Sequence, residues 1–101
     1  MKKILNGKLY DTNTANFCGC DSNGYGVGDY LYYSESLYRK KNGEFFLYGT
    51  GGAGTKYCEN HGNTRSGGDM IIPYTEEEAK EWASEHISVD DYMELFGAVE
   101  E

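Results

Sequence analysis

Polar and apolar side chains alternate around the dipeptide Asn42-Gly43, with Leu37 before it and an aromatic-rich run at 45–48 after it. Asn-Gly is typical of the type I′ turn of a β-hairpin, because both central residues of that turn need a positive φ. Aromatic side chains favour a pleated, half-buried strand. The pattern therefore predicts antiparallel strands at 36–41 and 44–49, ended by the glycines that follow.

Other segments repeat this strand pattern more weakly. A second pair, Asn6-Gly7, lies between two short apolar runs and predicts a hairpin across 2–10. Residues 30–33 and 70–73 are predicted to be extended, with Pro73 at a strand end or a sheet edge. Helix-capping residues at 11–14 predict a short helical turn at 15–18. The remaining predictions are a loop at 20–29 and a loop at 50–68, the second with a helical turn near 56–60.

The C-terminal quarter has a helical period. Thr75 and Glu78 have the spacing of a capping box, in which each side chain accepts a hydrogen bond from the other residue's backbone amide. A second helix is predicted to begin after Ser88 and to end at Gly97. Apolar side chains recur three and four residues apart, as on one helix face. The predicted buried faces are Ala79, Trp82, Ala83 and His86 in the first helix, and Val89, Tyr92, Met93 and Phe96 in the second.

These elements predict an α+β fold in one domain, residues 1–101. A small antiparallel sheet built on Asn-Gly hairpins is expected to be covered by two acidic, amphipathic C-terminal helices. Strands and glycine-rich loops occupy 1–74, the helical pair 75–97, and an acidic tail 98–101.

The charge is concentrated in one region. The net charge is −8, and residues 75–101 hold ten acids and one base, which leaves the first 74 residues at +1. A nucleic-acid-binding protein needs the opposite sign, because it must neutralise phosphates. No apolar run reaches the roughly 20 residues of a membrane span, and the N-terminus lacks the apolar segment of a signal peptide. We therefore expect a cytoplasmic protein.

The acidic helices have two interpretations. Charged helix faces are commonly only solvated, but a concentrated acidic surface also attracts a basic partner and speeds association with it. Exposed tyrosines are typical anchors of protein interfaces. Tyrosine-rich edge strands could also pair two copies, so monomer and homodimer both remain open. The predicted partner-binding residues are Glu76, Glu77, Glu81, Glu85, Asp90, Asp91, Glu94, Tyr30, Tyr32 and Tyr33.

A zinc site is the alternative function. Cys18 and Cys20, together with Cys58 and His61, supply the number and kind of ligands found in closed tetrahedral zinc sites. The alternative protein would be a structural or adaptor module in which zinc holds two loops together. The competing interpretation is three reduced cysteines, partly buried, with a surface histidine.

The sequence does not indicate an enzyme. The glycines at 49–54 match G-x-G-x-x-G, but no helix is predicted after them to receive a phosphate, and we expect them to serve a loop that needs positive φ. Cys58 could form a nucleophilic pair with His61 or His86, yet no orienting group or oxyanion hole accompanies it. We expect neither catalysis nor a cofactor other than the alternative zinc.

Three segments carry a resemblance to a known group: GKLYDTNTA at 7–15, ESLYRKKNGEFFLYG at 35–49 followed by Gly51-Gly52, and SGGDMIIPYTEEEAKEWA at 66–83. They resemble short proteins of bacterial phages, plasmids and integrated elements, and some small acidic proteins of this setting are anti-CRISPR inhibitors. The resemblance implies a non-catalytic inhibitor that mimics nucleic acid. Such a protein would bind a basic surface of a bacterial defence protein, such as a CRISPR effector, and would not bind nucleic acid itself.

Overall fold

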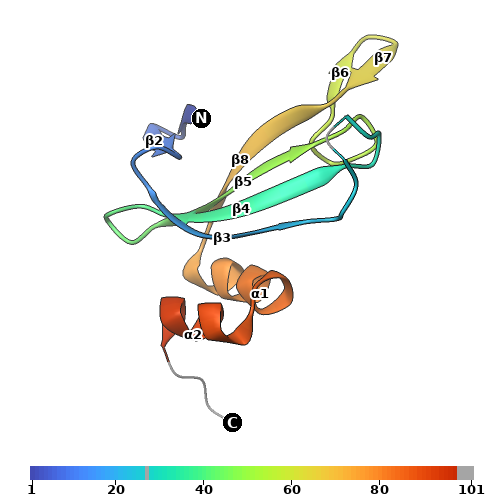
Figure 1. Cartoon of the computed structure of the whole chain (residues 1–101). Helices are drawn as coiled ribbons and strands as arrows, with labels where there is room; N and C mark the ends of the chain where they lie inside the picture. Colours follow the sequence, from blue (N-terminus) through green and yellow to red (C-terminus); the bar gives the residue numbers. More distant parts are fainter. Residues whose placement is uncertain (27, 98–101) are drawn as a thin grey trace.

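The computed structural model describes residues 1–26 and 28–97, so the predicted acidic tail at 98–101 lies outside the described residues. The fold is α+β, as predicted, with antiparallel sheets followed by two helices (Figure 1). The elements are β1 (Lys2–Leu5), β2 (Lys8–Asp11), β3 (Asn16–Ser22), β4 (Tyr33–Arg39), β5 (Phe45–Gly51), β6 (Glu59–His61), β7 (Thr64–Ser66), β8 (Gly68–Tyr74), α1 (Glu76–His86) and α2 (Val89–Phe96).

The main sheet has four antiparallel strands in the order β3-β4-β5-β8. The predicted central hairpin is confirmed as β4 and β5, although both strands differ from the predicted bounds. The predicted strand with Pro73 is also confirmed, as the edge strand β8. The first hairpin, β1 and β2, is confirmed and has positive φ at both Asn6 and Gly7, as a type I′ turn requires.

The turn at Asn42-Gly43 differs from the predicted type. Gly43 has φ +95°, but Asn42 is not among the residues with positive φ. Instead, the Gly43 amide donates to the Lys40 carbonyl, and the Asn42 side chain accepts from the Glu44 amide at 3.0 Å. The connection is therefore a longer turn in which a single glycine adopts the left-handed conformation.

Three local predictions were wrong, two of them because strand pairing overrode local preference. Residues 16–22 form β3 rather than a helical turn and a loop; the capping side chain of Asp11 closes only a short turn, by accepting from the Asn13 amide. Residues 59–61 pair with 64–66 in a hairpin, where a loop with a helical turn near 56–60 was predicted. Only Tyr33 of the segment 30–33 belongs to a strand.

The central strand β5 is covered on both faces. Phe45 and Leu47 point to the helices, where they form a core with Leu37 of β4 and the α1 stripe. Phe46, which points to the opposite face, packs with Tyr10 and Ile71. The N-terminal hairpin and the helical layer therefore lie on opposite faces of the sheet (Figure 1).

Both helices begin as predicted. Thr75 and Glu78 form the reciprocal capping box, and the Ser88 hydroxyl accepts from the Asp91 amide at 3.1 Å. The buried stripe of α1 is confirmed for Ala79, Trp82 and Ala83, with His86 half-buried.

The predicted buried face of α2 was half wrong. Tyr92 and Phe96 pack against the core, but Val89 is 73% exposed and Met93 is 40% exposed. No helix within residues 1–26 and 28–97 is long and apolar enough to cross a membrane.

Candidate functional site

The predicted acidic surface is exposed on the helical layer. Each of the seven acids selected from the sequence has an exposed side chain. One local base, Lys80, lies 3.9 Å from Glu76. The acids are therefore accessible to a partner, and most of their charge is not neutralised by neighbouring bases.

A groove runs between α1 and the sheet. It has a volume of about 270 Å³. Glu78, Glu81 and Glu85 follow a spacing of three and four residues, which places them along one edge of α1. The lining residues are Glu35, Lys56, Tyr74, Glu78, Glu81, Trp82, Glu85 and His86. Four of these eight side chains are carboxylates, so the groove favours a cationic group.

The buried carboxylate of Glu35 lines this groove. Its Oε1 accepts from the Trp82 indole nitrogen at 3.2 Å, and its Oε2 accepts from the Tyr57 hydroxyl. The Lys56 ammonium lies 3.1 Å from Oε2. Burial alone would raise the pKa of Glu35, but these three donors and the lysine charge outweigh it and hold the pKa below its ordinary value. Glu35 therefore stays ionised and fixes its neighbours in place.

Tyr57 reaches Glu35 by lying across a glycine. A Cβ at Gly49 would overlap the Tyr57 ring, so only glycine allows this approach. Burial, followed by the hydrogen bond to Glu35, raises the pKa of Tyr57 far above its ordinary value, which keeps the hydroxyl protonated as a donor. The glycines at 49, 51, 52 and 54 have ordinary φ, contrary to prediction, and instead admit neighbouring atoms at close range.

His86 closes one end of the groove. Its ring stacks on Trp82 with centroids 4.8 Å apart, and its Nδ1 lies 2.7 Å from Oδ2 of Asp21 on β3. Glu85 is 3.9 Å from the other ring nitrogen. The contact with β3 holds the C-terminal end of α1 against the sheet.

The three predicted tyrosines are only partly brought to this site. Tyr33 lines an adjoining cavity of about 370 Å³ together with Glu35, Lys56 and Tyr57. Tyr30, which is 60% exposed, lies against Gly54, which also lines this cavity. Tyr32 lines a different cavity beside Gly51 and Gly68. Tyr33 therefore lines a cavity that shares Glu35 and Lys56 with the acidic groove, and Tyr30 lies beside this cavity, whereas Tyr32 lines neither.

The four predicted zinc ligands are not brought together. Cys18 lies in a β-bulge and packs against the helical core, whereas Cys20 pairs with Ser36 on the strand next to it. Cys58 accepts from Arg65 at 3.4 Å, and His61 lies 3.1 Å from the Ser66 hydroxyl. Burial raises the pKa of the Cys18 thiol, which disfavours the thiolate that binds a metal. In the described part of the chain, no three His, Cys, Asp or Glu side chains group as metal ligands.

Sequence reasoning missed Glu35, Lys56 and Tyr57, and it treated Glu78 only as a helix cap. One signal was present for Glu35: it is two residues before Leu37, so it shares the core-facing side of the strand. A carboxylate at such a position needs buried partners. No comparable local signal identified Tyr57, because its contact depends on the fold of the loop before β6.

The glycine pattern at 49–54 does not have the geometry of a phosphate loop. Gly49 and Gly51 belong to β5, and the residues that follow form turns and then β6. A dinucleotide site requires a helix whose N-terminus directly follows the glycines.

Comparisons of the chain with protein-family models, with curated proteins and with solved structures found no match.

Proposed function

We propose that the protein is a non-catalytic inhibitor of a nucleic-acid-handling bacterial defence protein. The partner class is a CRISPR effector, in the cytoplasm of the host bacterium, and the inhibitor comes from a mobile genetic element. The helical acids and the groove beside α1 would occupy a basic surface of the effector and so block its nucleic acid. The resemblance of residues 7–15, 35–49 and 66–83 to mobile-element proteins supports this setting.

The observation that carries the proposal is the accessible carboxylate edge of α1. Glu81 and Glu85 stand at the groove in which Glu35 is already ionised and tied down. A lysine or arginine that enters this groove meets carboxylates on two sides. The intramolecular contact of Lys56 with Glu35 demonstrates that the groove accommodates an ammonium group.

Charge also accounts for partner choice. The acids of the helices repel nucleic acid and attract the lysine and arginine grooves that bind it. Because exposed charges are screened beyond about 8 Å at physiological salt, the attraction acts mainly at close range and weakens with added salt. A complex held in this way should form quickly and should be released by salt.

The test uses the tagged protein and a panel of purified CRISPR effectors. We expect one effector to be retained at low salt and released at high salt, and its binding to guide or target nucleic acid to fall as the inhibitor is added. Reversing Glu77, Glu81, Asp91 and Glu94 to lysine should abolish both effects while the circular dichroism spectrum is unchanged. The two readouts separate inhibition from simple association.

A smaller charge reversal supplies the matched control. Glu77→Lys with Glu81→Lys and Glu59→Lys with Asp69→Lys change the net charge equally, but the second pair lies on β6 and β8. Only the first pair should weaken effector binding. An equal loss of effector binding in both variants would mean that only the net charge of the protein matters and not the acids of α1. If no effector is retained by the unchanged protein, the proposed partner class is rejected.

A further inference from the structure

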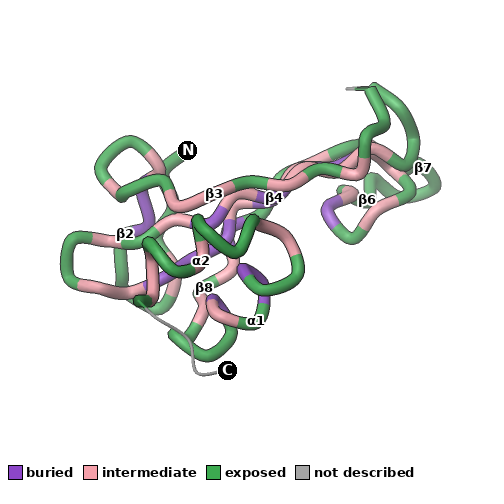
Figure 2. The backbone as a smooth tube through the Cα atoms, turned by 60° about the horizontal axis from the view of Figure 1, so that its bottom comes forward, coloured by how far each residue is buried: buried purple, intermediate pink, exposed green. Residues whose placement is uncertain are grey.

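The outer side of α2 carries an apolar ridge that the fold leaves uncovered. Val89 and Met93 are one helical turn apart and are 73% and 40% exposed. Asp90 and Glu94 form the neighbouring ridge and are also exposed. Figure 2 shows green, the colour of exposed residues, along much of the backbone of α2. Because Tyr92 and Phe96 already anchor α2 to the core, the outer ridge is not needed to hold the helix in place.

The N-terminal hairpin carries a second uncovered apolar pair. Ile4 and Leu9 are directly opposite each other in β1 and β2, and they are 70% and 51% exposed. Directly opposed side chains on one face of a hairpin have Cβ atoms about 5 Å apart. Residues four apart in a helix rise by about 6 Å along its axis. The two apolar pairs therefore have similar spacing.

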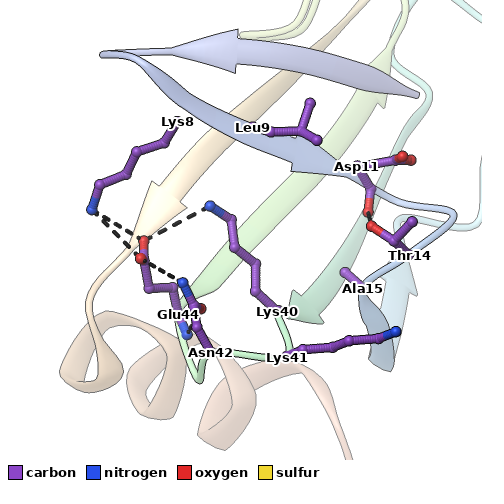
Figure 3. A pocket seen from close by; sticks show the side chains of 9 residues that line it. All are labelled: Lys8, Leu9, Asp11, Thr14, Ala15, Lys40, Lys41, Asn42 and Glu44. Carbon is purple, nitrogen blue, oxygen red and sulfur yellow. Dashed lines mark hydrogen bonds and ion pairs between the residues drawn. The ribbon is translucent and has the colours of Figure 1, made fainter.

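A cavity of about 560 Å³ with a basic rim lies beside this hairpin pair (Figure 3). Leu9 lines it together with three lysines, Lys8, Lys40 and Lys41, and two carboxylates, Asp11 and Glu44. Lys8 and Lys40 both point to the Glu44 carboxylate, at 3.4 and 3.9 Å. The rim therefore already holds one carboxylate between two ammonium groups and has a third lysine available.

We propose that the protein associates head to tail with a second copy of itself, with the outer ridge of α2 in one copy docked on the hairpin cavity of the next. The Val89 and Met93 side chains would cover Ile4 and Leu9. The carboxylates of Asp90 and Glu94 would face the lysine rim.

The fold excludes this contact within one chain, because the hairpin and α2 lie on opposite faces of the sheet (Figure 1). The contact joins two different surfaces, so a pair of copies keeps one free hairpin surface and one free α2 surface, and the association is open-ended unless it closes into a ring. The apolar ridge of α2 with its acids and the apolar pair of the hairpin with its lysines are therefore complementary surfaces of the same chain. The net charge of −8 opposes association only weakly at physiological salt, since repulsion is screened beyond about 8 Å.

The inference shares the acids Asp90 and Glu94 with the proposed function, but it does not rest on that function, because the apolar pairs Val89/Met93 and Ile4/Leu9 have no part in effector binding. Sedimentation velocity over a range of concentrations provides the first readout. We expect the weight-average mass to rise above that of one chain as concentration increases. A constant mass of one chain at every concentration would overturn the proposal.

Two variants each remove one surface. Ile4→Gln with Leu9→Gln alters the hairpin, and Val89→Gln with Met93→Gln alters α2; each should stay monomeric alone. Leu31→Gln with Met70→Gln is the matched control, because it removes two exposed apolar side chains elsewhere and should associate like the wild type.

Mixing the two variants distinguishes the head-to-tail contact from any symmetric dimer. The hairpin variant retains an intact α2, and the α2 variant retains an intact hairpin, so the mixture should form one contact and stop at two chains. Recovery of this dimer also demonstrates that both variants are folded. Failure of the mixture to associate, or self-association by either variant alone, would overturn the proposal. A chain that stays monomeric and binds anionic vesicles through Ile4 and Leu9 would also overturn the proposal.

Discussion

The indole nitrogen of Trp82 donates a hydrogen bond to the Glu35 carboxylate over 3.2 Å, joining α1 to β4 across 47 residues of sequence. The bond is buried, and its acceptor is ionised. It therefore links the helical layer to the sheet at the edge of the acidic groove.

Trp82→Phe keeps a large ring in the core but removes the donor to Glu35. We expect the free energy of unfolding to fall by about 1–3 kcal/mol, since a buried charged acceptor loses one partner. Urea unfolding measures this change. Tyr25→Phe, at an exposed position, should have almost no effect, and an equally small effect of Trp82→Phe would contradict the importance of the bond.

Acid should destabilise the protein in part through Glu35. The pKa of Glu35 in the folded chain lies below its ordinary value of 4.5, because three hydrogen bonds and the Lys56 charge outweigh the effect of burial. Its contribution to stability is therefore present above that ordinary value and is lost as the pH falls through the lower, folded-state pKa.

The test of this acid dependence compares Glu35→Gln with the wild type. The variant should be less stable at neutral pH and should lose less stability below about pH 4.5, as measured by urea midpoints at several pH values. Glu44 also has a lowered pKa and contributes in the same direction, so some acid dependence will remain in the variant. Identical pH profiles would rule out a role for Glu35.

Gly49→Ala should be strongly destabilising. The added methyl group would overlap the Tyr57 ring and displace it from Glu35. We expect a loss of about 3 kcal/mol, at the upper end for an overpacked core. Gly26→Ala is the matched control, because nothing lies within 4 Å of the added atom, and its effect should stay within about 0.5 kcal/mol.

Metal analysis of the purified protein tests the alternative function. Because the four candidate ligands lie apart, we expect less zinc than one ion per chain and little change in thermal stability on Cys58→Ser. A bound ion would contribute a large part of the folding free energy of so small a domain. Stoichiometric zinc that is lost in the Cys58 variant would establish the zinc-stapled module instead.

Local signals along the chain determined much of this fold. The hairpin of β1 and β2 follows from Asn6-Gly7, and the start of α1 follows from Thr75 with Glu78, because each depends on residues within one turn of each other. The accessible acids also follow from sequence, since a charged stripe opposite an apolar one must face solvent.

Only the tertiary structure decided the rest. It placed Glu35 under Trp82 and Tyr57, put Cys18 in a bulge, and left Val89 outside the core. These outcomes depend on residues far apart in the chain, whose approach is set by strand register and by the packing of one layer on another. The periodic spacing of apolar residues predicts which side chains share one face of a helix or strand. It does not say which other part of the molecule will cover that face.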